Sequence, residues 1–158
     1  MNVFASFFYN FIHNTPLMAA AVSTLIAQAV KFVINLIAYK KFDWYTLVAT
    51  GGMPSSHTAC VGALWASIAL IEGVGSTESA IAFVFAGIVY RDAVGVRRQA
   101  GVHAKILNTL NEEREASEEK SFLPKPLKTL LGHTPTQALV GLAIGLLVGY
   151  FYTRIILG

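Results

Sequence analysis

Residues 16–38 read PLMAAAVSTLIAQAVKFVINLIA, an apolar run with a single charge, Lys31. A helix needs about 20 apolar residues to cross the hydrocarbon core of a bilayer, and this run is long enough. Pro16 stands in the first turn, where a helix tolerates proline. The stretch therefore predicts a transmembrane helix and makes a membrane protein the first expectation for the chain.

The composition of the whole chain agrees with that expectation. Of its 158 residues 54% are hydrophobic and 13% charged, and the mean hydropathy is +0.56. An ordinary soluble domain carries about 25% charged residues. This length leaves room for four or five membrane helices, so we expect a single membrane domain over residues 1–158.

Three further apolar runs, each next to a polar or glycine-rich segment, predict membrane helices over residues 56–73, 79–95 and 135–157. The N-terminal MNVFASFFYNFIHN has aromatic residues but neither the basic flank nor the cleavage site of a signal peptide, so we expect an interfacial or re-entrant helix there. The predicted fold is an all-α integral membrane protein, a bundle of four transmembrane helices plus that N-terminal helix. Gly141, Gly145 and Gly149 have the spacing that favours close helix packing, and a homodimer is a further expectation.

Consecutive spans alternate in direction, which brings four polar features to one face of the membrane. They are Lys31, the PSSH of residues 54–57, residues 92–98 and His133. Of the twelve Lys and Arg residues only Arg154 falls clearly on the opposite face, so the positive-inside rule predicts that the shared face is cytoplasmic. Residues 99–131, which include NEEREASEEK, predict a charged cytoplasmic loop or short amphipathic helix over that face.

This set of residues suits phosphate chemistry. Cations and the amides of a helix start bind a phosphate dianion. Of two histidines, one can attack phosphorus while the other protonates the leaving alkoxide and then activates water. Taken singly, each residue has an ordinary explanation, since Lys31 can snorkel to the headgroups and Arg97 and Arg98 can simply set topology.

Two other classes of function are disfavoured. The chain lacks the basic stripe interleaved with aromatic residues that nucleic-acid binding needs. It has one cysteine, Cys60, and no pair of histidines at metal-ligand spacing, so no metal site and no cofactor are expected.

Three motifs in order, GGMPSSH, DAVGVRRQAG and LGHTPTQALVGLAIG, closely resemble the divergent, short membrane branch of the type-2 phosphatidic acid phosphatase superfamily, which is related to acid phosphatases and vanadium-dependent haloperoxidases. The resemblance runs from about residue 27 to 145. It implies that His133 is the nucleophile and His57 the general acid. It also implies a phosphate cradle formed by Lys31, Arg97, Arg98 and the amides around Ser55 and Ser56.

The sequence departs from the usual signature of that superfamily at several points. No Arg-Pro follows Lys31, unless Lys40 or Lys41 substitutes for the missing cation, and Ser56 replaces a glycine. More than thirty residues separate Arg98 from His133, and which of Arg91, Arg97 and Arg98 is the motif arginine stays open.

Gln137 stands where the superfamily has the aspartate that orients the histidine. An amide accepts the same hydrogen bond but carries no charge, which predicts a weaker nucleophile. Asp92, the only acid at this depth, is a hypothetical source of the charge.

The expected function is metal-free hydrolysis of a lipid phosphate, a phospholipid or isoprenoid phosphate monoester or diphosphate, through a phosphohistidine at the plasma membrane. Phosphatidylglycerophosphate, phosphatidate and undecaprenyl diphosphate are equal candidates. The alternative is a non-catalytic lipid-phosphate binding or transport protein that keeps the cradle, which Gln137 and the missing Arg-Pro favour.

Overall fold

The computed structural model describes residues 2–40, 52–117, 119–129 and 131–158. All regular secondary structure within these ranges is helical, which agrees with the predicted all-α membrane fold. The helices are α1 (Val3–Ile12), α2 (Thr15–Tyr39), α4 (Ser56–Ile71), α5 (Thr77–Val94), α6 (Val96–Ala116) and α7 (Pro135–Leu157).

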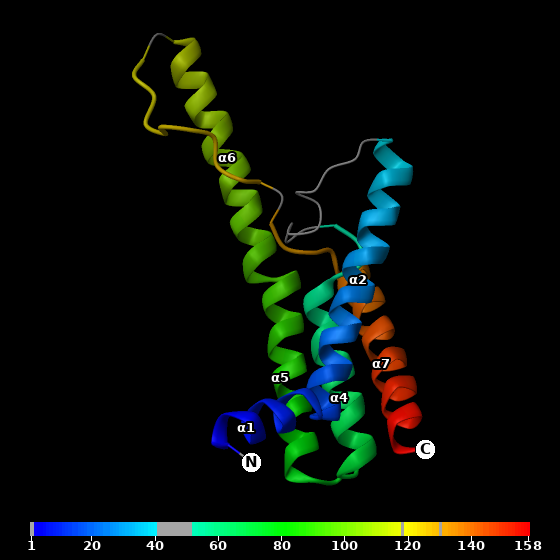
Figure 1. The fold of residues 1–158 in the computed structure, drawn as a ribbon. Coiled ribbons are helices and arrows are strands. Elements are labelled where there is room, and N and C mark those ends of the chain that lie inside the picture. Colours follow the sequence, from blue (N-terminus) through cyan, green and yellow to red (C-terminus); the bar gives the residue numbers. More distant parts are fainter. Residues whose placement is uncertain (1, 41–51, 118, 130) are drawn as a thin grey trace.

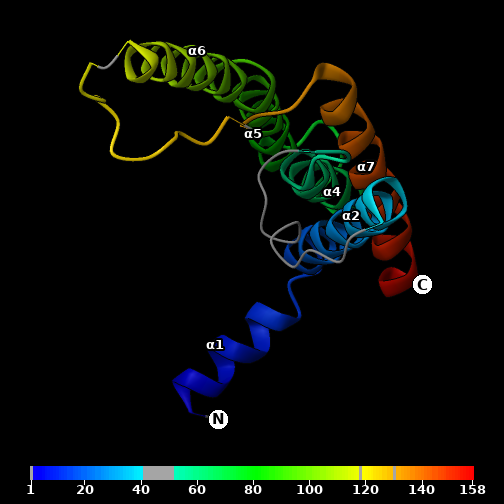
Figure 2. The ribbon, with the colours of Figure 1, turned by 90° about the horizontal axis from the view of Figure 1, so that it is seen from above.

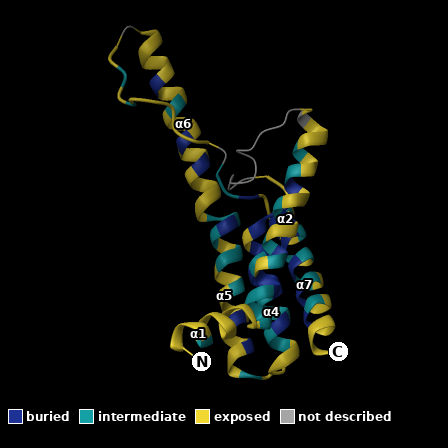
Figure 3. Ribbon diagram, in the orientation of Figure 1, coloured by how far each residue is buried: buried dark blue, intermediate teal, exposed yellow. Residues whose placement is uncertain are grey.

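Helix α4 lies at the centre of the bundle and packs against α2, α5 and α7 (Figures 1 and 2). Its buried residues are small: Ser56, Thr58, Ala59, Val61, Gly62, Ala63 and Ser67. Small residues let helix backbones approach closely, and in lipid this close packing replaces the hydrophobic effect as the source of helix association. The buried residues in Figure 3 accordingly gather where the bundle helices meet.

The glycines of α7 make the closest contact in the bundle. A Cβ on Gly149 would lie 2.6 Å from the carbonyl oxygen of Ala63, and Gly141 and Gly145 meet the α4 backbone in the same way. The predicted close packing of these glycines is confirmed, and it occurs within the chain. A homodimer stays a prediction, now without these glycines as its interface.

Replacing Gly145 by alanine is expected to destabilise the bundle by about 1–3 kcal/mol, because the new methyl group overpacks the α4 backbone. Its Cβ would lie 2.9 Å from the carbonyl carbon of Ala59. The matched control is Gly87→Ala on α5, where the Cβ meets nothing within 4 Å. That variant should gain about 0.5–1 kcal/mol from helix propensity. Thermal unfolding in detergent measures both, and equal transition temperatures would contradict the packing.

Three stretches are long and apolar enough to cross a membrane: Thr15–Ala38, Thr77–Ala116 and Pro135–Leu157. The predicted second span forms a helix, α4, but its 16 residues extend only about 24 Å, less than the hydrocarbon core of about 30 Å. The all-α membrane fold is therefore confirmed, whereas a bundle of four transmembrane helices stays a prediction.

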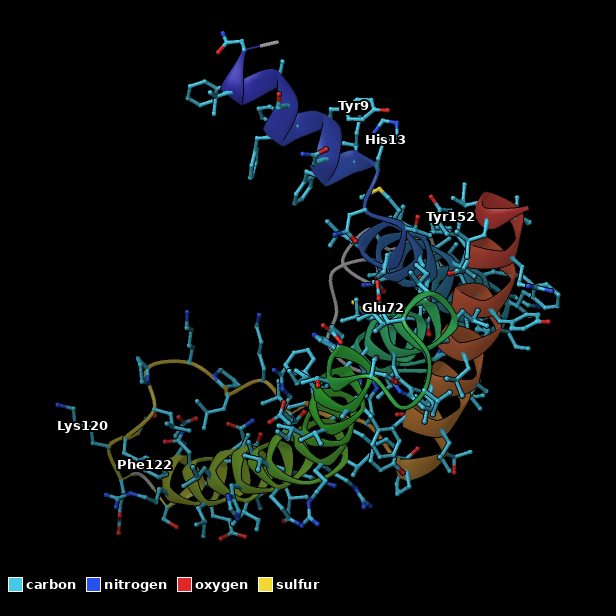
Figure 4. All side chains as sticks on the ribbon, turned by 90° about the horizontal axis from the view of Figure 1, so that it is seen from below. Tyr9, His13, Glu72, Lys120, Phe122 and Tyr152 are labelled. Carbon is cyan, nitrogen blue, oxygen red and sulfur yellow. The ribbon has the colours of Figure 1, made fainter. Side chains whose placement is uncertain are left out.

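The predicted N-terminal helix is present as α1, which leaves the bundle sideways at the end where α4 and α5 join (Figures 1 and 2). It buries no residue. Tyr9 and His13 stack at its junction with α2, with ring centroids 3.9 Å apart (Figure 4). The exposed aromatic surface of α1 fits the predicted place at a membrane interface.

The charged stretch differs from the predicted loop or short amphipathic helix. Residues 96–116 form the 21-residue helix α6, which continues from α5 and projects away from the bundle (Figure 1). Its length follows from a run of good helix formers without glycine or proline after Gly101. We call α6 and the segment 119–129, which returns along it, the arm.

Two asparagines fasten the returning segment to α6. The side-chain oxygen of Asn111 accepts hydrogen bonds from the backbone amides of Phe122 and Leu123, at 2.9 and 3.0 Å. Asn108 exchanges two hydrogen bonds with the backbone of Leu127, at 2.9 and 2.8 Å. Figure 4 shows Phe122 and Lys120 far out on this segment. These hydrogen bonds hold the segment 119–129 against α6, so the chain runs back towards the start of α6.

Candidate active site

A pocket of about 250 Å³ lies at the base of the arm, at the end of the bundle away from both chain termini. Its walls come from the starts of α4 and α6, the end of α5 and the residues before α7. The lining residues are His57, Ile88, Val89, Asp92, Ala93, Arg97 and His133. Four of the predicted site residues, separated by up to 76 positions in the sequence, thus share one cavity.

The backbone around Gly132 places His133 in this pocket. Gly132 has φ +74°, a backbone conformation that residues with a side chain rarely adopt. A Cβ at this position would also lie only 2.8 Å from the carbonyl carbon of Arg97. The backbone amide of His133 donates to the carbonyl of Ala93 at 2.9 Å. This contact explains how the chain tolerates more than thirty residues between Arg98 and His133, because the arm closes that gap in space.

Gln137 belongs to the helix cap that follows the histidine. Its side-chain oxygen accepts from the amide of Thr134 at 3.0 Å, and the hydroxyl of Thr134 accepts from the amide of Gln137 at 3.3 Å, which forms a capping box. The Gln137 oxygen thus serves the backbone at the start of α7, and the same side chain also acts on the imidazole, since it raises the pKa of His133.

A backbone carbonyl also orients the His133 imidazole. Nδ1 lies 3.0 Å from the carbonyl oxygen of Gly52. Because a carbonyl only accepts, Nδ1 is assigned as the donor and Nε2 carries the lone pair. Nε2 is buried and has no hydrogen-bond partner among the described residues. The geometry therefore leaves an unprotonated nitrogen of this pocket-lining residue without a hydrogen-bond partner among the described residues.

The surroundings of His133 favour its neutral form. Burial lowers the pKa of its imidazole below the usual 6.5, and the charges of Lys31 and His57 lower the pKa further, while the hydrogen bond to Gly52 and the side chain of Gln137 act in the opposite direction. A neutral imidazole near pH 7 is the form that can act as a nucleophile.

Lys31 provides a buried positive charge beside the histidines. Its side chain is 1% exposed, and its Cγ and Cδ lie 3.9 Å from the position of a Cβ on Gly52. Its charge acts electrostatically on both His57 and His133. The predicted membrane-embedded cation thus lies next to the pocket.

Asp92 and Arg97 form an ion pair across the turn between α5 and α6, with 2.5 Å between Oδ2 and Nε. Both act electrostatically on His57. Among the described residues, the structure gives no hydrogen bond between Asp92 and His133, although both line the pocket. The observed partner of Asp92 is thus the arginine, and the imidazole that it was expected to support rests on Gly52.

The start of α4 differs from the predicted cradle in one respect. The amide of Ser55 donates to the carbonyl of Gln137 at 3.2 Å, and its hydroxyl caps the amide of Thr58 at 3.4 Å, so neither group faces an anion. The amides of Ser56 and His57 are the first of the helix, where no intrahelical acceptor exists. The cradle at this end is therefore smaller than predicted.

The other predicted cations lie outside the pocket lining. Arg98 is exposed, and it is the backbone of Arg98 that packs against Gly132. Arg91 is exposed as well, and of these three arginines Arg97 is the one that lines the pocket. Lys40 ends α2 in the left-handed conformation, and Lys41 lies outside the described residues.

Sequence reasoning missed three contributors to the site. The carbonyls of Gly52 and Ala93 hold His133, and no side-chain pattern signals a backbone acceptor. Ile88 lines the pocket one helical turn before Asp92, and that spacing on α5 was the signal that could have found it.

Comparison with known proteins identifies the family of the chain. The family described as Divergent PAP2 family matches residues 12–148. The chain belongs to the Divergent PAP2 family. The uncharacterized membrane protein YuiD of Bacillus subtilis (strain 168) is 39% identical over 152 residues, which cover 88% of this chain and 96% of the relative. No solved structure matches the chain significantly.

Membership in the Divergent PAP2 family confirms the resemblance drawn from the three motifs, all of which lie within the matched residues. It relates the chain to the phosphatases of that superfamily. The membrane relative and the three long apolar stretches agree on a membrane location.

Proposed function

We propose that this chain is a membrane phosphatase that hydrolyses a lipid phosphate through a phosphohistidine intermediate. The observation that carries the proposal is the imidazole of His133, held at Nδ1 by Gly52 and unpartnered at Nε2 in a pocket that also contains His57 and Arg97. No metal ion takes part in the proposed reaction.

In the first step, the lone pair on Nε2 of His133 attacks phosphorus in line with the leaving alkoxide. The new P–N bond forms as the P–O bond breaks, and protonated His57 gives its proton to the alkoxide, which leaves as an alcohol. In the second step, neutral His57 takes a proton from water, which attacks phosphorus. The P–N bond breaks, and inorganic phosphate leaves while both imidazoles return to their starting states.

Cations close to the pocket would stabilise charge on the equatorial oxygens in both steps. Arg97 lines the pocket and Lys31 lies beside it. The amides at the start of α4 add the positive end of a helix dipole. Such electrostatic stabilisation is usually the largest single contribution to catalysis. Asp92 acts as a positioning residue, because its ion pair fixes the guanidinium of Arg97.

Lipid is the proposed substrate class, because the site sits among membrane helices. We place the pocket on the cytoplasmic face of the plasma membrane, since most Lys and Arg residues lie at that end. The proposed substrates are phospholipids and isoprenoids, and the group they share is a terminal phosphate monoester or diphosphate.

The test uses purified protein in detergent with phosphatidate, phosphatidylglycerophosphate and undecaprenyl diphosphate, and it measures release of inorganic phosphate. Vanadate mimics the pentacoordinate phosphoryl group and should inhibit the reaction. Phosphate release that vanadate leaves unchanged would contradict a phosphohistidine enzyme.

The rate should depend on pH through His133. Because its pKa is lowered, the neutral nucleophile persists below pH 6.5, and the acidic limb of kcat/KM should lie at lower pH than that of an ordinary histidine. Replacing Lys31 by methionine removes a charge that lowers this pKa, so the acidic limb should move to higher pH. A pH–rate profile of both proteins checks the shift. An acidic limb at the same pH in both would contradict the assignment.

A second candidate function is binding or transport of a lipid phosphate without turnover. Gln137 favours it, because the residue is uncharged and its oxygen serves the helix cap. Binding of phosphatidate without release of phosphate from any of the three lipids would select this candidate.

A further inference from the structure

A second depression lies on the outer surface of α5. It has a volume of about 460 Å³, and we call it the α5 groove. Its lining residues recur at the three- and four-residue spacing of one helix face. They are Thr77, Ala80, Ile81, Val84, Phe85 and Ile88.

The α5 groove runs into the candidate active site. Ile88 lines both cavities, and Asp92 stands one helical turn beyond it in the pocket. From Thr77 to Ile88 the helix rises about 16 Å, roughly half of a hydrocarbon core of about 30 Å. An apolar path about one leaflet long thus ends at the two histidines and Arg97.

The chemistry of the groove selects its occupant. Its lining holds no charged side chain, and Ile81, Val84 and Ile88 are each at least 60% exposed. It also lies within Thr77–Ala116, a stretch apolar enough to cross a membrane. A charged headgroup or a polar peptide would lose its hydration there without compensation, whereas a hydrocarbon chain would not.

We infer that the α5 groove holds one hydrocarbon chain of the substrate lipid while its phosphate occupies the pocket of His57 and His133. This inference rests on the proposed function. The lipid then enters the pocket sideways from the bilayer along α5, past Ile88.

The α5 groove orients the substrate lipid more than it increases the affinity of the protein for that lipid. A chain leaving the bilayer for the groove exchanges one apolar environment for another, so it gains little free energy. A chain aligned along α5 instead holds the phosphate near His133, and such positioning raises the rate of the chemical step. Blocking the groove should therefore reduce turnover of long-chain substrates most.

Photo-crosslinking tests the groove without requiring turnover. A phosphatidate with a diazirine near the end of one acyl chain is irradiated with the full-length protein in detergent, and the labelled peptides are identified. We expect label on residues 77–88, removed by excess phosphatidate but not by diacylglycerol. Equal labelling of α7 at its exposed Leu147, or labelling that phosphatidate does not compete, would overturn the inference.

Kinetics provide the second measurement. Val84→Trp and Ile81→Trp should each lower kcat/KM for long-chain phosphatidate about ten-fold more than for phenyl phosphate, which has no chain. Leu147→Trp, at a comparably exposed position on α7, should not change this ratio. Equal losses on both substrates would overturn the inference. If the wild type releases no phosphate at all, the proposed function fails, and the crosslinking still decides what the groove holds.

Discussion

Replacing His133 by alanine is expected to lower phosphate release about 10⁴-fold or more, the scale on which enzymes lose activity with their nucleophile. The variant loses the Nε2 that we propose attacks phosphorus, while His57 remains in the pocket as the proposed acid and base. Release of inorganic phosphate from a lipid phosphate, compared with wild type at equal protein concentration, measures the loss.

A control variant at a second histidine distinguishes loss of the nucleophile from damage to the fold. His103 is an exposed histidine on α6 outside the pocket lining, so His103→Ala should keep wild-type turnover. A phosphohistidine trapped by acid quench in the wild type and absent from His133→Ala would identify the intermediate. Wild-type turnover in His133→Ala would reject the mechanism.

Replacing Lys31 by methionine is expected to lower kcat/KM about a hundred- to a thousand-fold, the usual cost of removing one group that stabilises the transition state. Lys31 is almost fully buried beside the site, so its charge is poorly screened by water. Methionine keeps an unbranched chain of similar length, which should preserve the packing of α2. Initial rates across a range of substrate concentrations measure the effect.

Lys40→Met is the control on the same helix. Lys40 is exposed at the end of α2, nine residues beyond Lys31, and should tolerate the change with less than a two-fold effect on rate. Thermal unfolding of both variants checks that the fold is kept. Equal kcat/KM in Lys31→Met and wild type, with both folded, would remove Lys31 from the proposed cradle.

The helices could be predicted from the sequence because their apolar runs are long and because the residues that cap their first turns lie directly before them. Ser55 and Thr134 are side-chain caps, and both stand where the pattern began a helix. The convergence of His57, Asp92 and His133 was accessible too, because spans that alternate in direction bring these residues to one end of the bundle.

What sequence could not supply depends on the backbone and on distant contacts. The hydrogen bond from His133 to Gly52 joins residues 81 positions apart through a carbonyl, which every residue possesses. The side chain of Gln137 serves both the capping box and the imidazole of His133, and only the fold shows how it is shared between them. The length of α6 exceeds the prediction because a high density of charge is typical of a loop, whereas no glycine or proline interrupts residues 102–116.

The close approach of Gly132 to the backbone of Arg97 and Arg98 has a consequence for finding relatives of this chain. The arginine and the histidine meet at the base of the arm although more than thirty residues lie between them. A search pattern that requires a fixed interval between these two residues would pass over chains of this kind, whereas one that allows a helical insertion, and requires a glycine just before the histidine, would retrieve them.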